Sequence, residues 1–139
     1  MPPLTVSART TVLPSALELG AQDNGLTASL DSVTDGITAT GSGNQSSALL
    51  IVSKMNRITT VTGAGDAVRL PPAIAGLSII VRNAATTNAA NVYPSSATQG
   101  GVSGGDQINA GGQNNAYSLT VAANTIIFRC FTTGTWFTL

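Results

Sequence analysis

The chain has 139 residues with six basic and six acidic side chains, so its formal net charge is zero and only 9% of its residues are charged. This length suits one domain with a core of its own, and the charged fraction is far below the roughly 25% of an average domain. Without clustered Lys and Arg, the chain lacks the charge that attracts nucleic acid or anionic membranes. Because neutral copies do not repel one another, we expect the protein to work in an assembled state, with neither nucleic acid nor membrane as partner.

The first 35 residues differ in character from the rest and are predicted to be an N-terminal arm. Pro14 stands early in a short segment and Gly20 follows it, which favours one short helix over 14–19. The alternative is that this region adds ordinary strands to the same sheet. The start lacks the apolar stretch of a secretory signal, and no apolar run reaches the ~20 residues of a membrane helix. We therefore expect synthesis in the cytoplasm, an arm over 1–35 and a β-domain over 36–139.

Short apolar or alternating segments, separated by turn residues, follow one another from residue 48 to the end. Their length, β-branched content and bounding Gly, Pro and Asn residues are typical of strands. The predicted strands are 48–53, 57–62, 67–70, 77–82, 91–93, 106–109, 117–121, 125–132 and 135–139, with a long loop over 95–115 around one of them. Strands at this spacing favour an all-β fold, a β-sandwich or a barrel-like module.

The longest predicted strand, 125–132, runs into a hairpin at Thr133-Gly134. Alternation points Arg129 outward, as it does Arg82 in the strand 77–82, and a small buried side chain is the default role of Cys130. The aromatic side chains of this hairpin are expected in the core rather than on a sugar-binding platform; they are Phe128, Phe131, Trp136 and Phe137. A resemblance between segments 49–61 and 77–92 is no stronger than this composition produces by chance.

The residue types that catalysis usually needs are scarce. Histidine is absent and Cys130 is the only cysteine, so the usual general base, a Ser or Cys triad, an internal disulfide and a structural zinc site are all excluded. The carboxylates of Asp31, Asp35, Asp66 and Asp106 each adjoin Gly, Ser or Thr, where local turn hydrogen bonds are expected. We predict no catalytic residue, no metal site and no cofactor, and we expect that the protein is not an enzyme.

Several phrases in residues 36–139 together resemble small β-structured virion proteins of tailed bacteriophages, of the capsid decoration (cement) or fibre-associated type. The phrases are DGITATG at 35–41, NRITTVTGAGDAVRLPPAIAGLSIIVRNA at 56–84, NVYPS at 91–95, GDQIN at 105–109, AYSLTVAANTIIF at 116–128 and TGTWFTL at 133–139. The resemblance does not extend to the arm, and it implies no catalytic residue.

The resemblance implies a virion structural protein made in the host cytoplasm and carried on the capsid surface. Proteins of this kind are homotrimers that bind the major capsid protein across capsomer junctions and stabilise the shell. The apolar arm residues are the candidate interaction residues, as a clamp or a subunit-crossing segment; they are Pro2, Leu4, Val6, Val12 and Leu13. The alternative is a tail-fibre or tail-tip receptor-binding module, for which Tyr93 and Tyr117 are the candidate exposed aromatics outside the hairpin.

Overall fold

The computed structural model describes residues 32–139 except 97, 99 and 122, and this part of the chain is all-β, as predicted. The strands are β1 Val33–Thr38, β2 Leu49–Leu50, β3 Met55–Thr60, β4 Ala67–Arg69, β5 Ser78–Asn83, β6 Ala90–Tyr93, β7 Gln107–Ile108, β8 Tyr117–Leu119, β9 Asn124–Thr132 and β10 Thr135–Thr138, with one 3-10 turn, η1 Gln45–Ser47. No helix in the described residues has the length and hydrophobicity needed to cross a bilayer.

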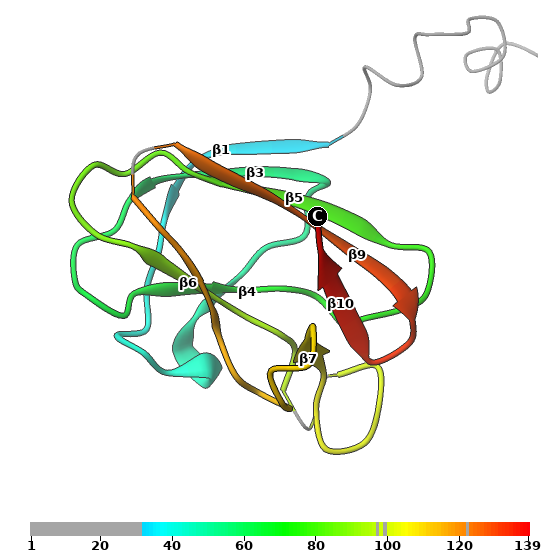
Figure 1. The fold of residues 1–139 in the computed structure, drawn as a ribbon. Helices are drawn as coiled ribbons and strands as arrows, with labels where there is room; N and C mark the ends of the chain where they lie inside the picture. The colour runs from blue at the N-terminus through cyan, green and yellow to red at the C-terminus, as the bar shows by residue number, and fades with distance from the viewer. Residues whose placement is uncertain (1–31, 97, 99, 122) are drawn as a thin grey trace, which may run out of the picture. The chain divides into compact units, whose positions relative to one another are not determined.

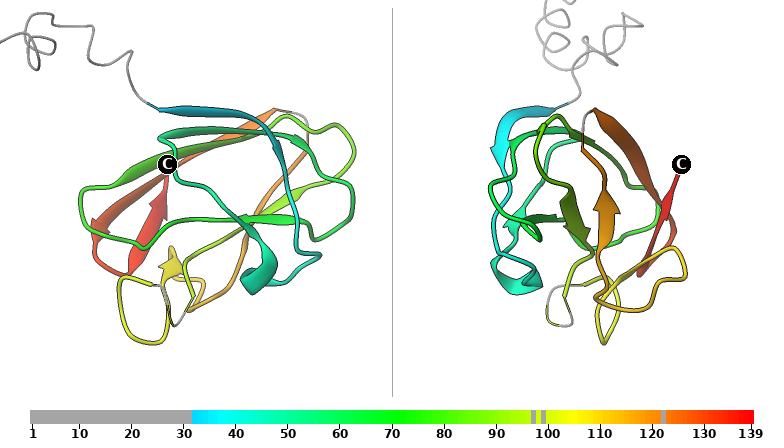
Figure 2. Two further views of the ribbon diagram at one scale, coloured as in Figure 1. Left: turned by 180° about the vertical axis from the view of Figure 1, so that it is seen from behind. Right: turned by 60° about the vertical axis from the view of Figure 1, so that its left-hand side comes forward.

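The first six strands form three stacked units, which we call rungs. Each rung is a strand of a six-stranded sheet followed by a strand of a four-stranded sheet: β1 and β2, then β3 and β4, then β5 and β6. Within each sheet, successive rungs pair in parallel. Figures 1 and 2 show β1, β3 and β5 side by side in one layer and the strands of the smaller sheet in the other. Such stacking is solenoid-like, because each unit contacts mainly its neighbours along the stack.

After the third rung, antiparallel strands close one end of the stack. β9 runs antiparallel along the whole of β5, and β8 pairs with β6 in the smaller sheet. β10 folds back on β9 through the predicted turn at Thr133-Gly134, where Gly134 has a φ of +93°, and β7 pairs in parallel with β10. At the other end, β1 and β2 are edge strands with no further strand beyond them in the described residues.

The core fills the space between the two sheets with side chains from every rung. The alternation of buried and more exposed positions along β3, β5 and β6 is the period of two expected for strands with one buried face. The largest fully buried apolar side chains are Trp136, Phe128, Ile58, Leu70, Leu119, Val68, Val81 and Val92. Since residues of all three rungs and of the closing hairpin belong to one core, residues 33–139 form one compact unit.

The predicted sandwich or barrel is not confirmed, because the first strands do not pair with their sequence neighbours. Each pairs instead with the strand one rung later, across about twenty-five residues in the case of β3 and β5, as a parallel crossover connection requires. The two segments that resemble each other in sequence turn out to be stacked: Asn56 and Arg57 lie beside Val81 and Arg82. The paired residues are 25 positions apart, whereas the sequence similarity aligns Leu49 with Leu77, so the stacking does not establish a sequence repeat.

The predicted boundary between arm and domain falls inside a strand. β1 spans Val33–Thr38, so the compact unit begins before residue 36. Gly36, with a φ of +76°, allows a bulge in which Asp35 and Gly36 together face Arg57, and this irregularity hid the strand from a pattern-based prediction. The short helix predicted over 14–19, like nearly all of the predicted arm, lies outside the described residues.

A buried carboxylate anchors the long loop over 95–115. Asp106 is fully buried, and its carboxylate accepts hydrogen bonds from the backbone N–H of Ala73 at 2.7 Å and of Gly101 at 2.6 Å. The backbone at Gly101 runs so close to the β4–β5 connection that an added Cβ would collide with the carbonyl oxygen of Ala73. The Asp106 carboxylate therefore holds two chain segments against each other at a spacing that only glycine allows.

We expect Gly101→Ala to lower the free energy of unfolding by about 1–3 kcal/mol, because the backbone must shift to admit the methyl group. Gly63→Ala is the matched control, since the nearest atom to a Cβ there is the Asp66 Oδ2 at 3.6 Å. The control should change stability by less than about 0.5 kcal/mol. Urea unfolding of the full chain measures both, and equal stabilities of the two variants would contradict the close approach.

Candidate interaction surface

A row of apolar side chains crosses the outer face of the six-stranded sheet. The strand register places Val33 beside Met55, Met55 beside Ile80 and Ile80 beside Ile127. The N–H of Leu139 donates to the Ile127 carbonyl at 2.9 Å, which brings the last residue into the same row. We call these five residues the apolar row. Its end members are 59% and 62% exposed and its middle members are half-buried.

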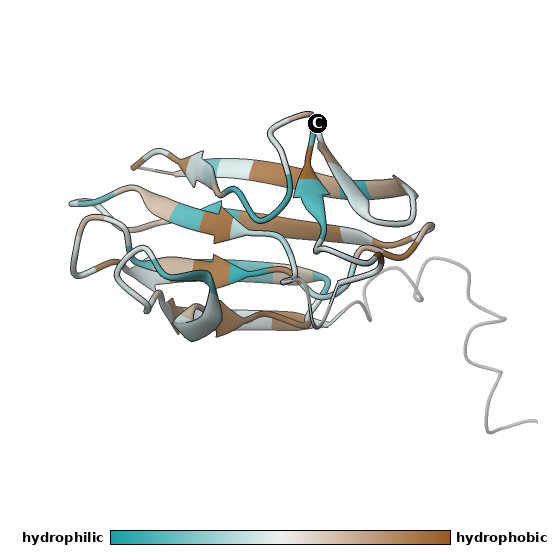
Figure 3. Cartoon of the chain, turned by 90° about the horizontal axis from the view of Figure 1, so that it is seen from below, coloured by the Kyte–Doolittle hydropathy of each residue, from teal (hydrophilic) through white to brown (hydrophobic). Residues whose placement is uncertain are grey.

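The row runs across the strands, along the direction in which the rungs stack. Figure 3 shows apolar residues on each of the neighbouring strands, those that face the core included. An open hollow of about 230 Å³ adjoins the row, and Val33, Met55 and Ile80 contribute to its lining. The apolar row is therefore a continuous strip rather than a scatter of single residues, and continuous apolar strips on a protein surface mark interaction sites.

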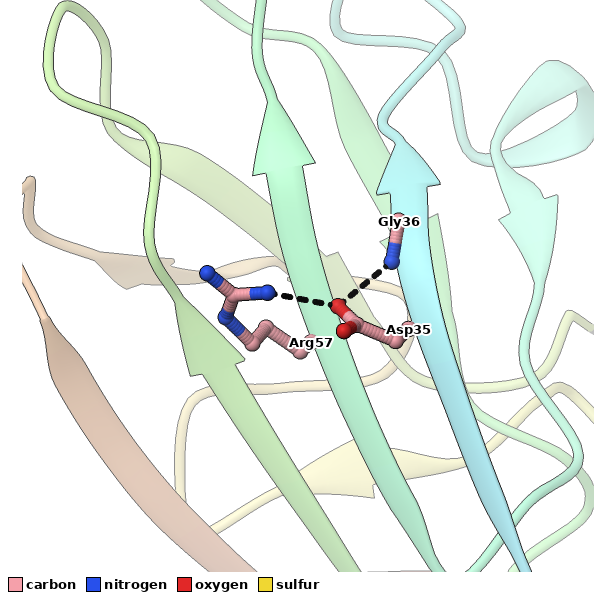
Figure 4. Close-up of polar contacts among 3 residues, drawn as sticks. All are labelled: Asp35, Gly36 and Arg57. Carbon is pink, nitrogen blue, oxygen red and sulfur yellow. Dashed lines mark hydrogen bonds and ion pairs between the residues drawn. The ribbon is translucent and has the colours of Figure 1, made fainter.

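Arginines flank the apolar row on both sides. Arg57 forms an ion pair with Asp35 at 2.8 Å, and the backbone N–H of Gly36 also donates to that Asp35 oxygen (Figure 4). These two contacts hold the pKa of the Asp35 carboxyl below its usual value, the Arg57 hydrogen bond contributing most. Arg82 donates to the Thr125 hydroxyl at 3.1 Å. Within the described residues, neither Arg82 nor Arg129 pairs with a carboxylate.

An aromatic pair extends the apolar surface on β9 and β10. The rings of Phe131 and Phe137 lie 5.8 Å apart at a tilt of 59°, and Phe131 is 65% exposed. The expectation that all four aromatic side chains of the hairpin lie in the core is wrong for these two. Phe128 and Trp136 are buried as expected, but the alternation of β9 places Phe131 on the opposite face from Phe128 and Cys130.

The outer face of the four-stranded sheet is different in character. Arg69, Asn91, Tyr93 and Ser118 face outward there, and the exposed Leu50 of β2 lies beside Arg69. The Tyr93 hydroxyl donates to the Gly43 carbonyl at 2.6 Å. The two tyrosines considered for receptor binding are both half-buried; the ring of Tyr117 packs edge-on against Phe128 at 5.8 Å. The outer face of the six-stranded sheet thus carries a row of five apolar side chains between charged ones, and no comparable row crosses the described outer face of the four-stranded sheet.

The described carboxylates are occupied by hydrogen bonds within the fold. The Asp66 carboxylate accepts from the backbone N–H of Gly63 at 2.9 Å and of Ser42 at 3.1 Å, and these two bonds, that from Gly63 first, lower the pKa of Asp66. Gly63 lies in the turn between β3 and β4 and Ser42 lies in the connection between β1 and β2, so Asp66 ties the first rung to the second. The Asp106 carboxylate accepts the hydrogen bonds from Ala73 and Gly101 described above. Asp31 lies outside the described residues.

Cys130 occupies the place expected for a small buried side chain. It is 3% exposed, its Sγ donates to the Thr132 carbonyl at 3.2 Å, and burial raises the pKa of its thiol. The described residues hold no group of three or more His, Cys, Asp or Glu side chains that could bind a metal ion. The arm residues predicted to interact, Pro2, Leu4, Val6, Val12 and Leu13, lie outside the described residues.

The lowered pKa of Asp66 predicts a loss of stability in acid. A carboxyl whose pKa is depressed by folding stabilises the fold above its unfolded pKa of about 4, and this contribution disappears as the pH falls through the folded pKa. We therefore expect the free energy of unfolding to fall below about pH 4, and to fall less steeply in Asp66→Asn.

The control for this experiment is Asp35→Asn, which removes an exposed ion pair and should change the pH dependence less than Asp66→Asn does. Urea unfolding at a series of pH values measures all three proteins. A variant Asp66→Asn as acid-sensitive as the native protein would show that the Asp66 carboxylate is not the group responsible.

Comparison with known proteins found no match, so the function is argued from the surface described above. No family model, curated protein or solved structure matches the chain.

Proposed function

We propose that the protein is a structural component of a virion, a head decoration protein that binds as a homotrimer across junctions of the major capsid protein. The observation that carries the proposal is the apolar row, a strip of five side chains crossing the outer face of the six-stranded sheet. A protein with no net charge and such a strip is suited to assembly with other protein surfaces. The resemblance of residues 36–139 to phage virion proteins supports a virion as the larger assembly.

The stability of the assembled shell would follow from mass action. A decoration trimer that binds across a junction contacts two or more capsomers, and this composite site exists only in the assembled shell. Binding to the assembled form alone stabilises it, in proportion to the logarithm of the ratio of free protein to its dissociation constant. The tight turns and the buried Asp66 and Asp106 carboxylates support the stiff surface that such binding needs.

The number of copies per particle tests the proposal. A head decoration protein should be present in hundreds of copies, because capsomer junctions are that numerous on a shell. Quantitative mass spectrometry of purified particles, with the major capsid protein as internal standard, gives the ratio. Absence from particles would exclude any virion role, and a few to tens of copies would exclude head decoration.

A heat challenge tests the stabilising mechanism. Particles that lack the protein should release their DNA at a lower temperature than complete particles, and added purified protein should restore the difference. Release of DNA is followed by the fluorescence of an intercalating dye during heating. Identical release temperatures in the presence and absence of the protein would contradict a cementing role.

A second candidate function is a tail-fibre or tail-tip module that binds a receptor. An open hollow of about 480 Å³ on the closing hairpin favours it, because the lining combines the Phe137 ring with the side chains of Gln107, Asn109 and Thr135. An aromatic ring beside amides and hydroxyls is a combination that ligand sites use. If this function holds, Phe137→Ala should abolish adsorption of particles to host cells without changing the copy number.

A further inference from the structure

We propose that the open hollow beside Met55 and Ile80 binds a carboxylate that carries an apolar chain, as a fatty acid does. In this site Arg82 holds the carboxylate and the apolar row contacts the chain. The inference goes beyond the proposed function and does not depend on it.

The hollow combines apolar side chains with two arginines. Its volume is about 230 Å³. The apolar members of its lining all belong to the apolar row; they are Val33, Met55 and Ile80. The polar members of the lining include no carboxylate; they are Asn56, Arg57, Arg82 and Thr125. Apolar side chains with a small number of polar groups are the usual lining of a small-molecule site.

The strand register places the two arginines next to each other. Arg57 and Arg82 are direct partners in the parallel pairing of β3 and β5, and both are exposed. Like charges at neighbouring positions of a sheet destabilise it. Arg57 donates to the Asp35 carboxylate of β1, on the side away from β5. Arg82 donates to the Thr125 hydroxyl of β9, on the side away from β3. An anion bound in the hollow would therefore reduce the repulsion between the two arginines.

The charges around the hollow leave one positive charge to be balanced. Asp35 neutralises Arg57, whereas Arg82 has no carboxylate partner within the described part of the chain. The Thr125 hydroxyl takes one N–H donor of the Arg82 guanidinium and leaves the others for a ligand. A carboxylate carries a single negative charge and accepts two parallel hydrogen bonds from an arginine. A phosphate monoester carries a charge of about −1.5 to −2 near neutral pH, which is more than Arg82 alone balances. The site therefore fits a carboxylate better than a phosphate.

Both arginines lie on the same side of the apolar row. Arg57 follows Met55 by two residues and faces the same side of the sheet, and the same spacing separates Arg82 from Ile80. Two residues of a strand span about 7 Å, so a chain attached to a carboxylate at Arg82 reaches Ile80 and Met55. Because the hollow shares these residues with the apolar row, the ligand and a protein partner on the row would exclude each other.

The first test compares ligands that differ only in their head group. Isothermal titration calorimetry of the full chain should show binding of octanoate, whereas octanol and octylammonium should bind at least about tenfold more weakly. This factor is that of a charge-assisted hydrogen bond. Equal affinities for octanoate and octanol, or no binding of octanoate, would overturn the proposal.

The second test removes the arginine that holds the carboxylate. Arg82→Gln keeps an apolar stem and an N–H donor, and it should weaken the binding of octanoate about tenfold. The matched control is Arg129→Gln, which changes an exposed arginine of the same sheet that is not part of the lining. Arg129 lies four residues along β9 from Thr125, or about 13 Å, which exceeds the Debye length of about 8 Å at physiological salt.

The control should therefore change the affinity for octanoate by less than about twofold. Equal losses in the two variants would show a general attraction by surface charge and would contradict a defined site.

Asp35→Asn tests the count of charges through a gain of binding. The substitution releases Arg57 and removes a negative charge next to the hollow, so octanoate should bind about two- to fivefold more tightly. Because the Asp35–Arg57 ion pair is exposed, the variant is expected to fold. Unchanged or weaker binding would show that the charges do not act as proposed.

The length of the ligand tests the contact with the apolar row. Each methylene that is buried raises the affinity up to about fourfold, so hexanoate should bind several-fold more weakly than octanoate. Amide NMR spectra recorded with octanoate should show the largest shift changes at Met55, Ile80 and Arg82. Equal affinities for the two ligands, or shift changes centred on another part of the chain, would overturn the proposal.

Discussion

The parallel pairing of β1, β3 and β5 is the constraint on which the rest of the structure depends. Apart from the irregular register between Thr34 and Thr38 of β1, paired residues fall into rows across the sheet. The inward rows, with Ile58 and Val81, make the core, and the outward rows make the exposed face. A slip of one residue would exchange the two sets and place Arg57 and Arg82 in the core, which is why the register is strongly specified. The same pairing that builds the core therefore builds the apolar row.

Buried polar side chains hold the turns that keep this register. Asn83 is fully buried; its Nδ2 donates to the carbonyls of Asn88, Leu119 and Thr120 at 3.2 Å, and its Oδ1 accepts from the Ala85 N–H at 3.0 Å. The Nδ2 of Asn88 in turn donates to the backbone carbonyls of Val61 and Thr62, which lie in the second rung between β3 and β4. A buried amide that is left without hydrogen-bond partners costs free energy, and its bonds require a specific geometry. These side chains therefore favour one arrangement of the neighbouring turns. The high content of Asn and Gly, which looked like loop composition in the sequence, is part of how the rungs stack.

The sequence was a good guide to where the strands lie and a poor guide to how they pair. The strands 67–70, 91–93 and 125–132 were placed to within a residue or two, because alternation and turn residues are local signals. Parallel pairing between β3 and β5 joins residues far apart in the chain and leaves no local mark, so a sandwich was expected instead. The partners of Asp106, which come from Ala73 and Gly101, were hidden for the same reason. The apolar row could not be found from the sequence at all, because it exists only once the register is known, although alternation alone was sufficient to place Phe131 opposite Cys130.

Where contacts between copies occupy the apolar row, the outer face of the six-stranded sheet is no longer available to the capsid. The surfaces left for a scaffold are then the outer face of the four-stranded sheet, the loops and the open first rung. The first of these is mainly polar, with Asn91, Tyr93 and Ser118, and suits a contact mediated by hydrogen bonds and water rather than by apolar burial. The open rung carries Leu49, Leu50 and Val52, each at least 42% exposed, and β2 is an edge strand of its sheet within the described part of the chain. Unpaired edges with apolar side chains are the surfaces that most readily accept a strand from another protein. Each copy of the proposed homotrimer would offer one such edge, so binding at one edge would raise the effective concentration of the other two.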